Sequence, residues 1–190
     1  MNEEAQKALL LGILRGYVQL AWAGWPALHP DMPRRVAHWP RLSAAELRSE
    51  LNRYLSEASS SPEGVRVYWK LGAGLSYAGA NRHFLADVGA RHVDEILGLD
   101  DFNPTFPWGA GQAARLRADD ERLLRTGEAV TRIEQQQIGV ALNWSRVAKA
   151  PIRDAAGTVR GLVGMYQRLD PELGRRLYYE QEARESARAV

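Results

Sequence analysis

Two pairs of adjacent aspartates are the clearest candidates for acid–base chemistry in this sequence. They are Asp100–Asp101 and Asp119–Asp120. Paired carboxylates act together only when both face the same reacting atom, whereas neighbouring residues on a helix point about 100° apart. We therefore expect these aspartates to cap helices and to remain solvated. The two pairs predict no acid–base dyad.

Metal and nucleophile chemistry has equally little support. His29 and His38 lack the spacing of a metal-binding set, and His83 and His92 are isolated, as surface histidines usually are. The chain has no cysteine, which excludes disulfides, thiolate metal ligands and thiol nucleophiles. It also has no glycine-rich phosphate loop, nucleophile elbow or HExxH sequence. The sequence predicts no metal site, no catalytic residue and no enzymatic activity.

Length and charge are those of an ordinary globular protein. The chain has 190 residues, 45% of them hydrophobic and 25% charged, which suits one domain with an extension or two very small domains. Its 25 basic and 23 acidic residues leave a net charge of +2, and the arginines are spread along the chain. A nucleic-acid-binding surface needs clustered basic residues, so no nucleic-acid partner is expected.

One segment, residues 8–28, has the length and apolar character to be considered as a membrane span. Arg15 and Gln19 lie near its centre, and Pro26 interrupts its end. A charged side chain is costly at the centre of a bilayer, and the acidic start of the chain is unlike a secretory signal. We therefore expect a buried helix in a cytoplasmic protein, and no contact with a membrane.

The N-terminal third is predicted to be helical. Apolar residues recur at helical spacing over residues 3–20. Prolines and tryptophans then interrupt residues 21–40. Ser43 and Glu46 form a capping box that begins a second helix, and the Ser-Pro-Gly-containing stretch at residues 59–64 marks the best domain boundary.

From residue 65 onwards the pattern changes to strands separated by turns. Strands are predicted at residues 65–69, 75–78, 129–136, 140–149 and 158–168. A short helix after Asn81 and a longer helix over residues 112–125, ended by Gly127, separate the second strand from the third. Asp170 and Pro171 begin a C-terminal helix. Hairpins around a helical insert predict an α+β fold with an antiparallel sheet.

Five stretches of this second part, taken in order, form a recognisable series. They are Val67–Lys70, Gly79–Phe84, Ile96–Phe102 with Pro107–Trp108, Asp119–Asp120 with Thr126–Glu128, and Lys149–Gly157 with Gly161–Gly164. The series resembles the PAS domain family, and more closely its PAS-fold-4 branch of bacterial sensor kinases and regulators. The resemblance implies a five-stranded antiparallel sheet with short helices on one face. The predicted divisions are a helical extension at residues 1–62, the PAS domain at 63–169 and a C-terminal helix at 170–190.

A PAS domain encloses a pocket between its sheet and its helices. By resemblance to flavin-binding members, the face of the last strand that carries Tyr166 lines this pocket, and Ser145 and Val147 of the preceding strand join it. The other ligand-binding candidates are Tyr77, Phe84, Trp108, Arg115 and Leu116. The alternative is that the apolar members of this set only fill the core, and that Arg115 lies solvated on a helix.

The resemblance leaves the identity of any cofactor or ligand open. A flavin–cysteinyl adduct is excluded because the chain has no cysteine, and Asp101 stands where the resemblance would place one. Haem needs an axial ligand, usually histidine. Neither His83 nor His92 lies on the long helix that carries this ligand in haem-binding relatives, so haem is not expected.

The resemblance implies a sensory module for signal transduction, in which a small molecule or a partner protein changes a state that the flanking helices relay. The helix at residues 3–20 would expose a large apolar face unless it covered the sheet or paired with a second copy. We predict a homodimer through the N-terminal helices, with Trp22, Trp25 and Trp39 in or near the interface. The alternatives are an interaction scaffold with a self-filled pocket and, less favoured, a haem-based gas or redox sensor.

Overall fold

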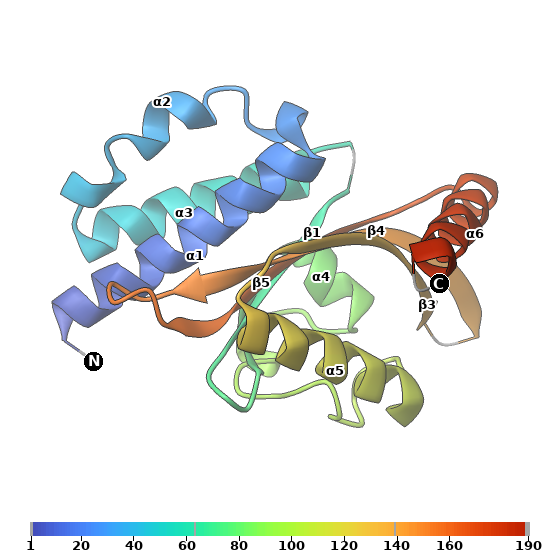
Figure 1. Ribbon diagram of the computed structural model, residues 1–190. Coiled ribbons are helices and arrows are strands. Elements are labelled where there is room, and N and C mark those ends of the chain that lie inside the picture. Colours follow the sequence, from blue (N-terminus) through green and yellow to red (C-terminus); the bar gives the residue numbers. More distant parts are fainter. Residues whose placement is uncertain (1, 63, 139, 189–190) are drawn as a thin grey trace.

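The computed structural model describes residues 2–62, 64–138 and 140–188. A five-stranded antiparallel sheet in the order β2–β1–β5–β4–β3 forms its centre. Helices α1 to α3 lie on one side of the sheet and α4 and α5 on the other, while α6 projects from one end (Figure 1). The predicted α+β fold with an antiparallel sheet, an N-terminal helical extension and a C-terminal helix is confirmed.

The strands are β1 (Arg66–Leu71), β2 (Ser76–Ala80), β3 (Val130–Ile138), β4 (Ala141–Arg153) and β5 (Val159–Arg168). The α-helices are α1 (Glu3–Gly24), α2 (Met32–Val36), α3 (Ala44–Ser60), α4 (Arg82–Asp87), α5 (Ala110–Thr126) and α6 (Pro171–Arg188). Three single turns of 3-10 helix connect them: η1 (Pro26–Leu28), η2 (Trp39–Arg41) and η3 (Val93–Glu95).

Local signals fix several element ends as predicted. Ser43 and Glu46 form the capping box at the start of α3. The side chain of Asn81 accepts a hydrogen bond from the backbone N–H of Phe84 at 3.2 Å and caps α4. Gly127 ends α5 with a φ of 66°, a left-handed conformation that glycine adopts without strain.

Strand β4 is longer than predicted, because it continues through Pro151 to Arg153. The pairing of β4 with β3 stops at Lys149, opposite Val130, whereas its pairing with β5 continues past Pro151. Beyond Lys149 one edge of β4 is therefore unpaired. A proline, which has no N–H to donate, is tolerated at such an edge.

The two faces of the sheet have separate apolar cores, because side chains alternate along each strand. On β5, Leu162 and Tyr166 face the helices α4 and α5, whereas Val163 and Met165 face the N-terminal helices. This confirms the alternation predicted for the last strand. Strands β4 and β5 therefore contact both helical layers at once.

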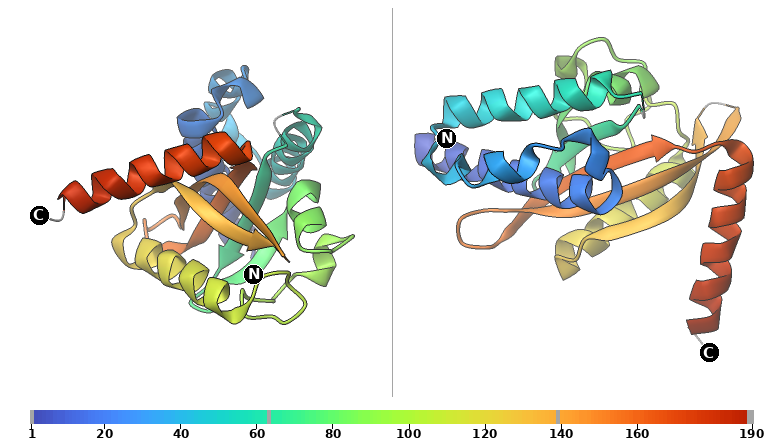
Figure 2. Two further views of the ribbon diagram at one scale, coloured as in Figure 1. Left: turned by 90° about the vertical axis from the view of Figure 1, so that its right-hand side faces the viewer. Right: turned by 90° about the horizontal axis from the view of Figure 1, so that it is seen from above.

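Helix α1 lies across β4 and β5 and packs on α3 (Figure 2). Two glycines allow its close approach. A Cβ atom at Gly12 would lie 2.5 Å from the backbone oxygen of Arg153, and one at Gly16 would lie 3.1 Å from Val163 Cγ2. The helix thus uses the first of the two options considered for its apolar face: it covers the outer face of the sheet.

This arrangement corrects the expectation for two tryptophans. Trp25 and Trp39 are buried within the chain, with 3% and 2% of their surface exposed. Trp25 also donates a hydrogen bond from Nε1 to Gln167 Oε1 at 2.9 Å, which ties α1 to β5. Both residues are core residues of their own chain and have almost no surface to offer a second copy, whereas Trp22 is 48% exposed. Across the described ranges, no helix combines the length and hydropathy needed to cross a bilayer.

A buried histidine links the N-terminal helices. His29 Nε2 lies 2.5 Å from the hydroxyl oxygen of Tyr17 on α1, and His29 Nδ1 lies 2.7 Å from Glu57 Oε2 on α3. Burial lowers the pKa of His29, and its hydrogen bond to Glu57 only partly offsets that effect. The ring is therefore held neutral: it donates to Glu57 and accepts from Tyr17.

We expect Gly12→Ala to loosen α1, because the added methyl group meets a backbone atom that cannot rotate away. The expected loss is about 1–3 kcal/mol of unfolding free energy, the usual cost of overpacking. Gly24→Ala is the matched control, since it lies in the same helix with open space around it. Urea denaturation measures both variants, and an equal stability for the two would contradict this account of how α1 docks.

The state of His29 predicts a pH dependence of stability. The unfolded chain takes up a proton near pH 6.5, whereas the folded chain resists protonation of His29 until lower pH. Unfolding free energy should therefore fall as the pH drops below about 6.5, by at most about 1.4 kcal/mol per pH unit for one proton.

His29→Gln should remove this component of the pH dependence, and His38→Gln, an exposed position, should leave it in place. Denaturation curves between pH 7.5 and 5 make the comparison. Parallel curves for the wild type and His29→Gln would show that the folded state binds the proton as readily as the unfolded one.

Candidate functional site

A small cavity of about 30 Å³ lies between the sheet and helices α4 and α5. Six of the eight predicted ligand-binding residues line it: Tyr77, Phe84, Trp108, Leu116, Val147 and Tyr166. They come from β2, α4, the segment before α5, α5 itself, β4 and β5. The fold therefore brings these residues together around one space, which has room for only one or two water molecules.

The other two candidates lie elsewhere. Ser145 is buried but does not line the cavity. Its hydroxyl donates a hydrogen bond at 3.1 Å to Oε1 of Gln136, which does line the cavity. Arg115 is exposed and points away from the cavity, although its neighbour Leu116 lines it. Consecutive residues on α5 point about 100° apart, so Arg115 and Leu116 reach different surfaces. The solvated alternative for Arg115 is the one that the structure adopts.

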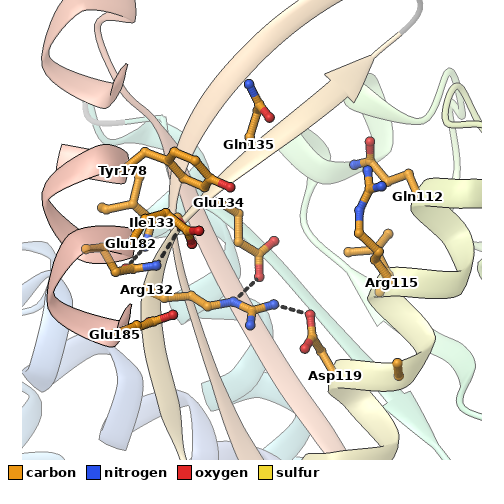
Figure 3. Close-up of a pocket in the computed structure, with 13 residues that line it drawn as sticks. Gln112, Arg115, Asp119, Arg132, Ile133, Glu134, Gln135, Tyr178, Glu182 and Glu185 are labelled. Atoms are coloured by element: carbon orange, nitrogen blue, oxygen red, sulfur yellow. Dashed lines mark hydrogen bonds and ion pairs between the residues drawn. The ribbon is translucent and has the colours of Figure 1, made fainter. Parts of the chain in front are cut away.

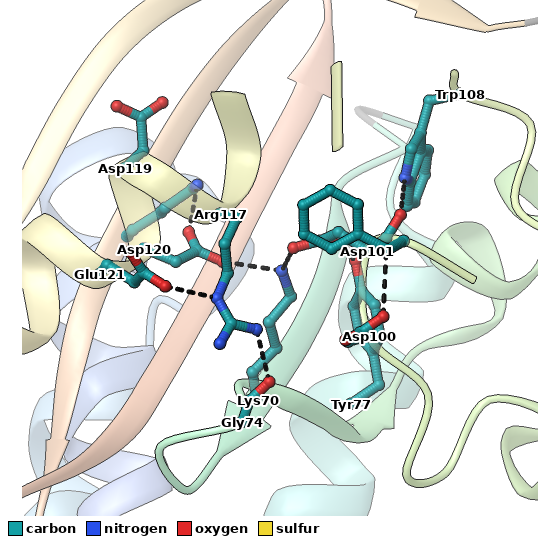
Figure 4. A network of polar contacts seen from close by, with 12 residues as sticks. Lys70, Gly74, Tyr77, Asp100, Asp101, Trp108, Arg117, Asp119, Asp120 and Glu121 are labelled. Carbon is teal, nitrogen blue, oxygen red and sulfur yellow. Dashed lines mark hydrogen bonds and ion pairs between the residues drawn. The ribbon is translucent and has the colours of Figure 1, made fainter. Parts of the chain in front are cut away.

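The most unusual feature of the cavity is a network of four buried charges (Figure 4). Lys70 Nζ lies 2.5 Å from Asp101 Oδ2 and 2.7 Å from Asp120 Oδ2. Lys149 Nζ lies 2.5 Å from Asp120 Oδ1. None of the four side chains is more than 1% exposed. Two ammonium groups and two carboxylates therefore neutralise one another inside the core.

Each charge of the network comes from a different element. Lys70 belongs to β1, Lys149 to β4 and Asp120 to α5, while Asp101 lies in the segment between η3 and α5. The hydroxyl of Tyr77 donates to Asp101 Oδ1 at 2.8 Å, and the indole N–H of Trp108 donates to the Asp101 carbonyl oxygen at 2.8 Å. The network thus connects the sheet to the helical layer.

Local electrostatics keep these groups in the forms that pair. Burial opposes the charged form of Asp120, but the ammonium groups of Lys149 and Lys70 outweigh it and lower the pKa of this carboxyl group. Burial likewise opposes the charge on Lys149, but the Asp120 carboxylate raises the pKa of this ammonium group above its ordinary value. Burial, followed by the charge of Asp101, raises the pKa of Tyr77, which remains a hydroxyl donor.

Sequence reasoning missed this network. The expectation that the aspartates are solvated or cap helices is wrong for Asp101 and Asp120, which pair with lysines in the core. One signal was available: Lys149 shares a strand face with the candidate residue Val147, two positions away, and Lys70 shares one with the aromatic residue Tyr68. A lysine on such a face needs a buried partner of opposite charge.

A groove of about 470 Å³ lies on the surface between α5, β3 and α6 (Figure 3). Arg132 lines this groove and forms ion pairs with Asp119 and Glu134; its Nε lies 2.9 Å from Glu134 Oε1. Gln181 of α6 accepts a hydrogen bond from the backbone N–H of Ile133 at 2.8 Å. Arg115 lines this groove. The groove is the place where α6 meets the edge strand of the sheet.

Neither a flavin nor a haem fits this cavity as it is packed. The cavity of about 30 Å³ is far smaller than a site of several hundred Å³ for such a group. His83 and His92 are not among the cavity-lining residues. Among the residues that the structure describes, no three histidine, aspartate or glutamate side chains gather in a way that could hold a metal ion.

We expect Lys149→Met to destabilise the protein strongly, because it leaves Asp120 with a single ammonium partner in the core. Removing one partner of a buried ion pair typically costs about 3–5 kcal/mol. Arg160→Met is the control, because its partner Asp154 lies on an exposed hairpin and the pair should contribute little. Guanidinium denaturation compares them, and similar midpoints would mean that the network adds no more than a surface pair.

The chain matches a known protein family and is similar to solved structures. The family model of the PAS fold matches residues 58–170, more than half of the chain. A search of curated proteins finds no match. Among solved structures, the PAS domain of Bordetella pertussis BvgS is 17% identical with a TM-score of 0.53, and the match covers 71% of this chain and 98% of that one.

Two further structures are similar. An RNA-binding light-oxygen-voltage receptor is 22% identical with a TM-score of 0.52, over 73% of this chain and 38% of that one. Vibrio cholerae VqmA is 23% identical with a TM-score of 0.46, over 54% of this chain and 46% of that one. The chain spans about half the length of the VqmA chains that it matches. The match to the family model and the sheet topology agree, and the chain belongs to the PAS-fold family.

Proposed function

We propose that this chain is a sensory module. A small molecule or a partner protein alters the packing around the cavity, and the flanking helices relay the change. One observation carries the proposal: strands β4 and β5 line the cavity on one face and hold α1 on the other. Val147 and Tyr166 face the cavity, whereas Ala148 and Val163 face the N-terminal helices. A shift of either strand therefore moves both surfaces.

The C-terminal helix supports the same proposal. Helix α6 follows β5 after two residues and projects away from the rest of the chain (Figure 2). The side-chain amide of Gln181 pairs with the backbone of Ile133, accepting at 2.8 Å and donating at 3.3 Å. Tyr179 on α6 is 62% exposed. The helix is thus fastened to the edge strand on one side and open to a partner on the other.

The proposal includes a homodimer through the N-terminal helices. The sheet covers only one face of α1, and Trp22 and Arg15 lie on the exposed part of this helix. Tryptophan and arginine are enriched at protein interfaces. The absence of a nucleic-acid partner stays a prediction.

We also propose that the module is a receptor and not an enzyme. The carboxylates of Asp101 and Asp120 are buried and paired with ammonium groups. Carboxylates held in this way are poor general bases, because the neighbouring ammonium groups stabilise the negative charge and weaken its attraction for a proton. This supports binding, and not turnover, as the role of the interior.

One observation favours a second candidate function, an interaction scaffold. The cavity of about 30 Å³ is nearly filled by the protein's own side chains. In that case docking of a partner would be the whole function, and changes inside the PAS domain would have no effect on the flanking helices.

A mutation in the cavity wall separates the two candidates. Val147→Ala removes methyl groups from the cavity face of β4, and we expect it to raise amide hydrogen exchange in α6 several-fold. Val88→Ala is the control: it deletes the same groups in the same core, but its residue lies outside the sheet and the cavity lining. Both variants are compared with the wild type by mass spectrometry at matched global stability.

Equal exchange in α6 for both variants would favour the scaffold.

Light scattering on the same samples reports the oligomeric state, where a homodimer has twice the 21.2 kDa mass of one chain. A concentration-independent monomer would remove the dimer from the proposal.

A further inference from the structure

Two donors on neighbouring strands form a site for a carboxylate in the cavity wall. Lys70 on β1 and Tyr77 on β2 are directly paired across the two strands. The ammonium group of Lys70 binds one oxygen of the Asp101 carboxylate at 2.5 Å, and the hydroxyl of Tyr77 binds the other at 2.8 Å. The two donors are buried, with 1% and 3% of their surface exposed. We call this pair the Lys70–Tyr77 cradle.

The carboxylate in the cradle comes from a surface segment, whereas both donors come from the sheet. Asp101 lies between η3 and α5, in a stretch without regular structure. Its neighbour Phe102 is 51% exposed, and Leu97 a few residues earlier is 45% exposed. The donors are therefore held by paired strands, while the acceptor reaches them from a loop. The loop is held to β2 by two backbone hydrogen bonds, from the Tyr77 N–H to the Leu99 carbonyl oxygen at 2.8 Å and from the Gly98 N–H to the Tyr77 carbonyl oxygen at 2.9 Å. Irregular segments generally open at a lower free energy than paired strands.

The walls beside the cradle are apolar and aromatic. Tyr68 and Phe84 have ring centroids 4.9 Å apart, and Tyr77 and Phe84 have centroids 5.3 Å apart. Trp108 lines the same cavity and is anchored to the carbonyl oxygen of Asp101. An outward movement of Asp101 and its loop would open the cradle beside an aromatic wall and enlarge the cavity.

We propose that Asp101 acts as an internal ligand of the Lys70–Tyr77 cradle, and that the external ligand is a small carboxylate with an apolar or aromatic body that takes its place. This inference rests on the proposed function, because it names the class of molecule that the interior receives.

Charge balance selects an anion. With Asp101 displaced, Asp120 is the one carboxylate among the described residues within ion-pair distance of Lys70 and Lys149, since the nearby Glu134 is paired with Arg132. One buried ammonium group then needs a new partner. A carboxylate restores the balance with one charge and two acceptor oxygens, which match the two donors. A neutral amide or an amine leaves Lys70 uncompensated. A phosphate brings more negative charge next to Asp120, which already lies 2.7 Å from Lys70.

The test measures the binding of benzoate and 3-methylbutanoate to the full chain by calorimetry, in a buffer free of carboxylates. Benzamide and 3-methylbutanamide are the neutral probes of matched shape. We expect saturable binding of the acids, no measurable binding of the amides, and faster amide exchange at residues 97–108 with the acid bound.

Two pairs of variants locate the site. In the Asp101→Ala background, where no internal carboxylate competes for the cradle, Tyr77→Phe should weaken benzoate binding about tenfold or more, since it removes a hydrogen bond to a charged group. Tyr166→Phe is its control, because Tyr166 lines the same cavity but donates to Asp87. Asp101→Ala removes the internal competitor and should strengthen binding about tenfold or more, whereas Asp100→Ala should not.

Three results would overturn the inference. Benzoate that binds Asp101→Ala but not the wild type would make Asp101 a permanent structural partner of Lys70. Equal binding of acid and amide would refute the ligand class. Equal effects of Tyr77→Phe and Tyr166→Phe would refute the cradle. None of these outcomes affects the Val147→Ala exchange experiment, so a failure of the sensory proposal is recognised separately.

Discussion

The rest of the structure depends on four charges that share a core. Lys70, Lys149, Asp101 and Asp120 are each costly to bury alone, and each is compensated only when the others are in place. They come from two strands, a helix and a loop, so the electrostatic requirement fixes the sheet relative to the helical layer. The same requirement explains the small cavity, because the interior is filled by ion pairs and aromatic rings. Replacing one interior carboxylate by another keeps the charges balanced, whereas most other replacements of an interior group do not.

Strands β4 and β5 connect this charged interior to the N-terminal helices. Lys149 and Tyr166 face inward, while Ala150 and Val163 on the same strands face α1. Gly12 brings α1 against the backbone of β4, so little space is available to absorb a movement of the strand. A closely packed contact of this kind transmits displacement instead of damping it. The interior and the N-terminal helices are therefore joined by the same two closely packed strands, as the proposed relay requires.

Much of the fold follows from short stretches of sequence. The capping box at Ser43, the cap at Asn81 and the left-handed turn at Gly127 each depend on residues within a few positions of one another. Alternation along β5 separates the two cores in the same local way. Six of the eight ligand-binding candidates surround one cavity, because strand alternation and the family resemblance both point to that face. Arg115 does not, because one position along a helix is enough to change the surface that a side chain reaches.

The sequence by itself determined where most helices and strands begin and end and which face of the last strand is which, since these depend on neighbours along the chain. Tertiary structure alone decided that Asp101 and Asp120 are buried and that Trp25 and Trp39 belong to the core of their own chain. Lys70 is 31 residues from Asp101 and 50 from Asp120, and Lys149 is 29 from Asp120. An aspartate is solvated or ion-paired according to what packs over it, and at these separations only the folded chain brings the partner into place.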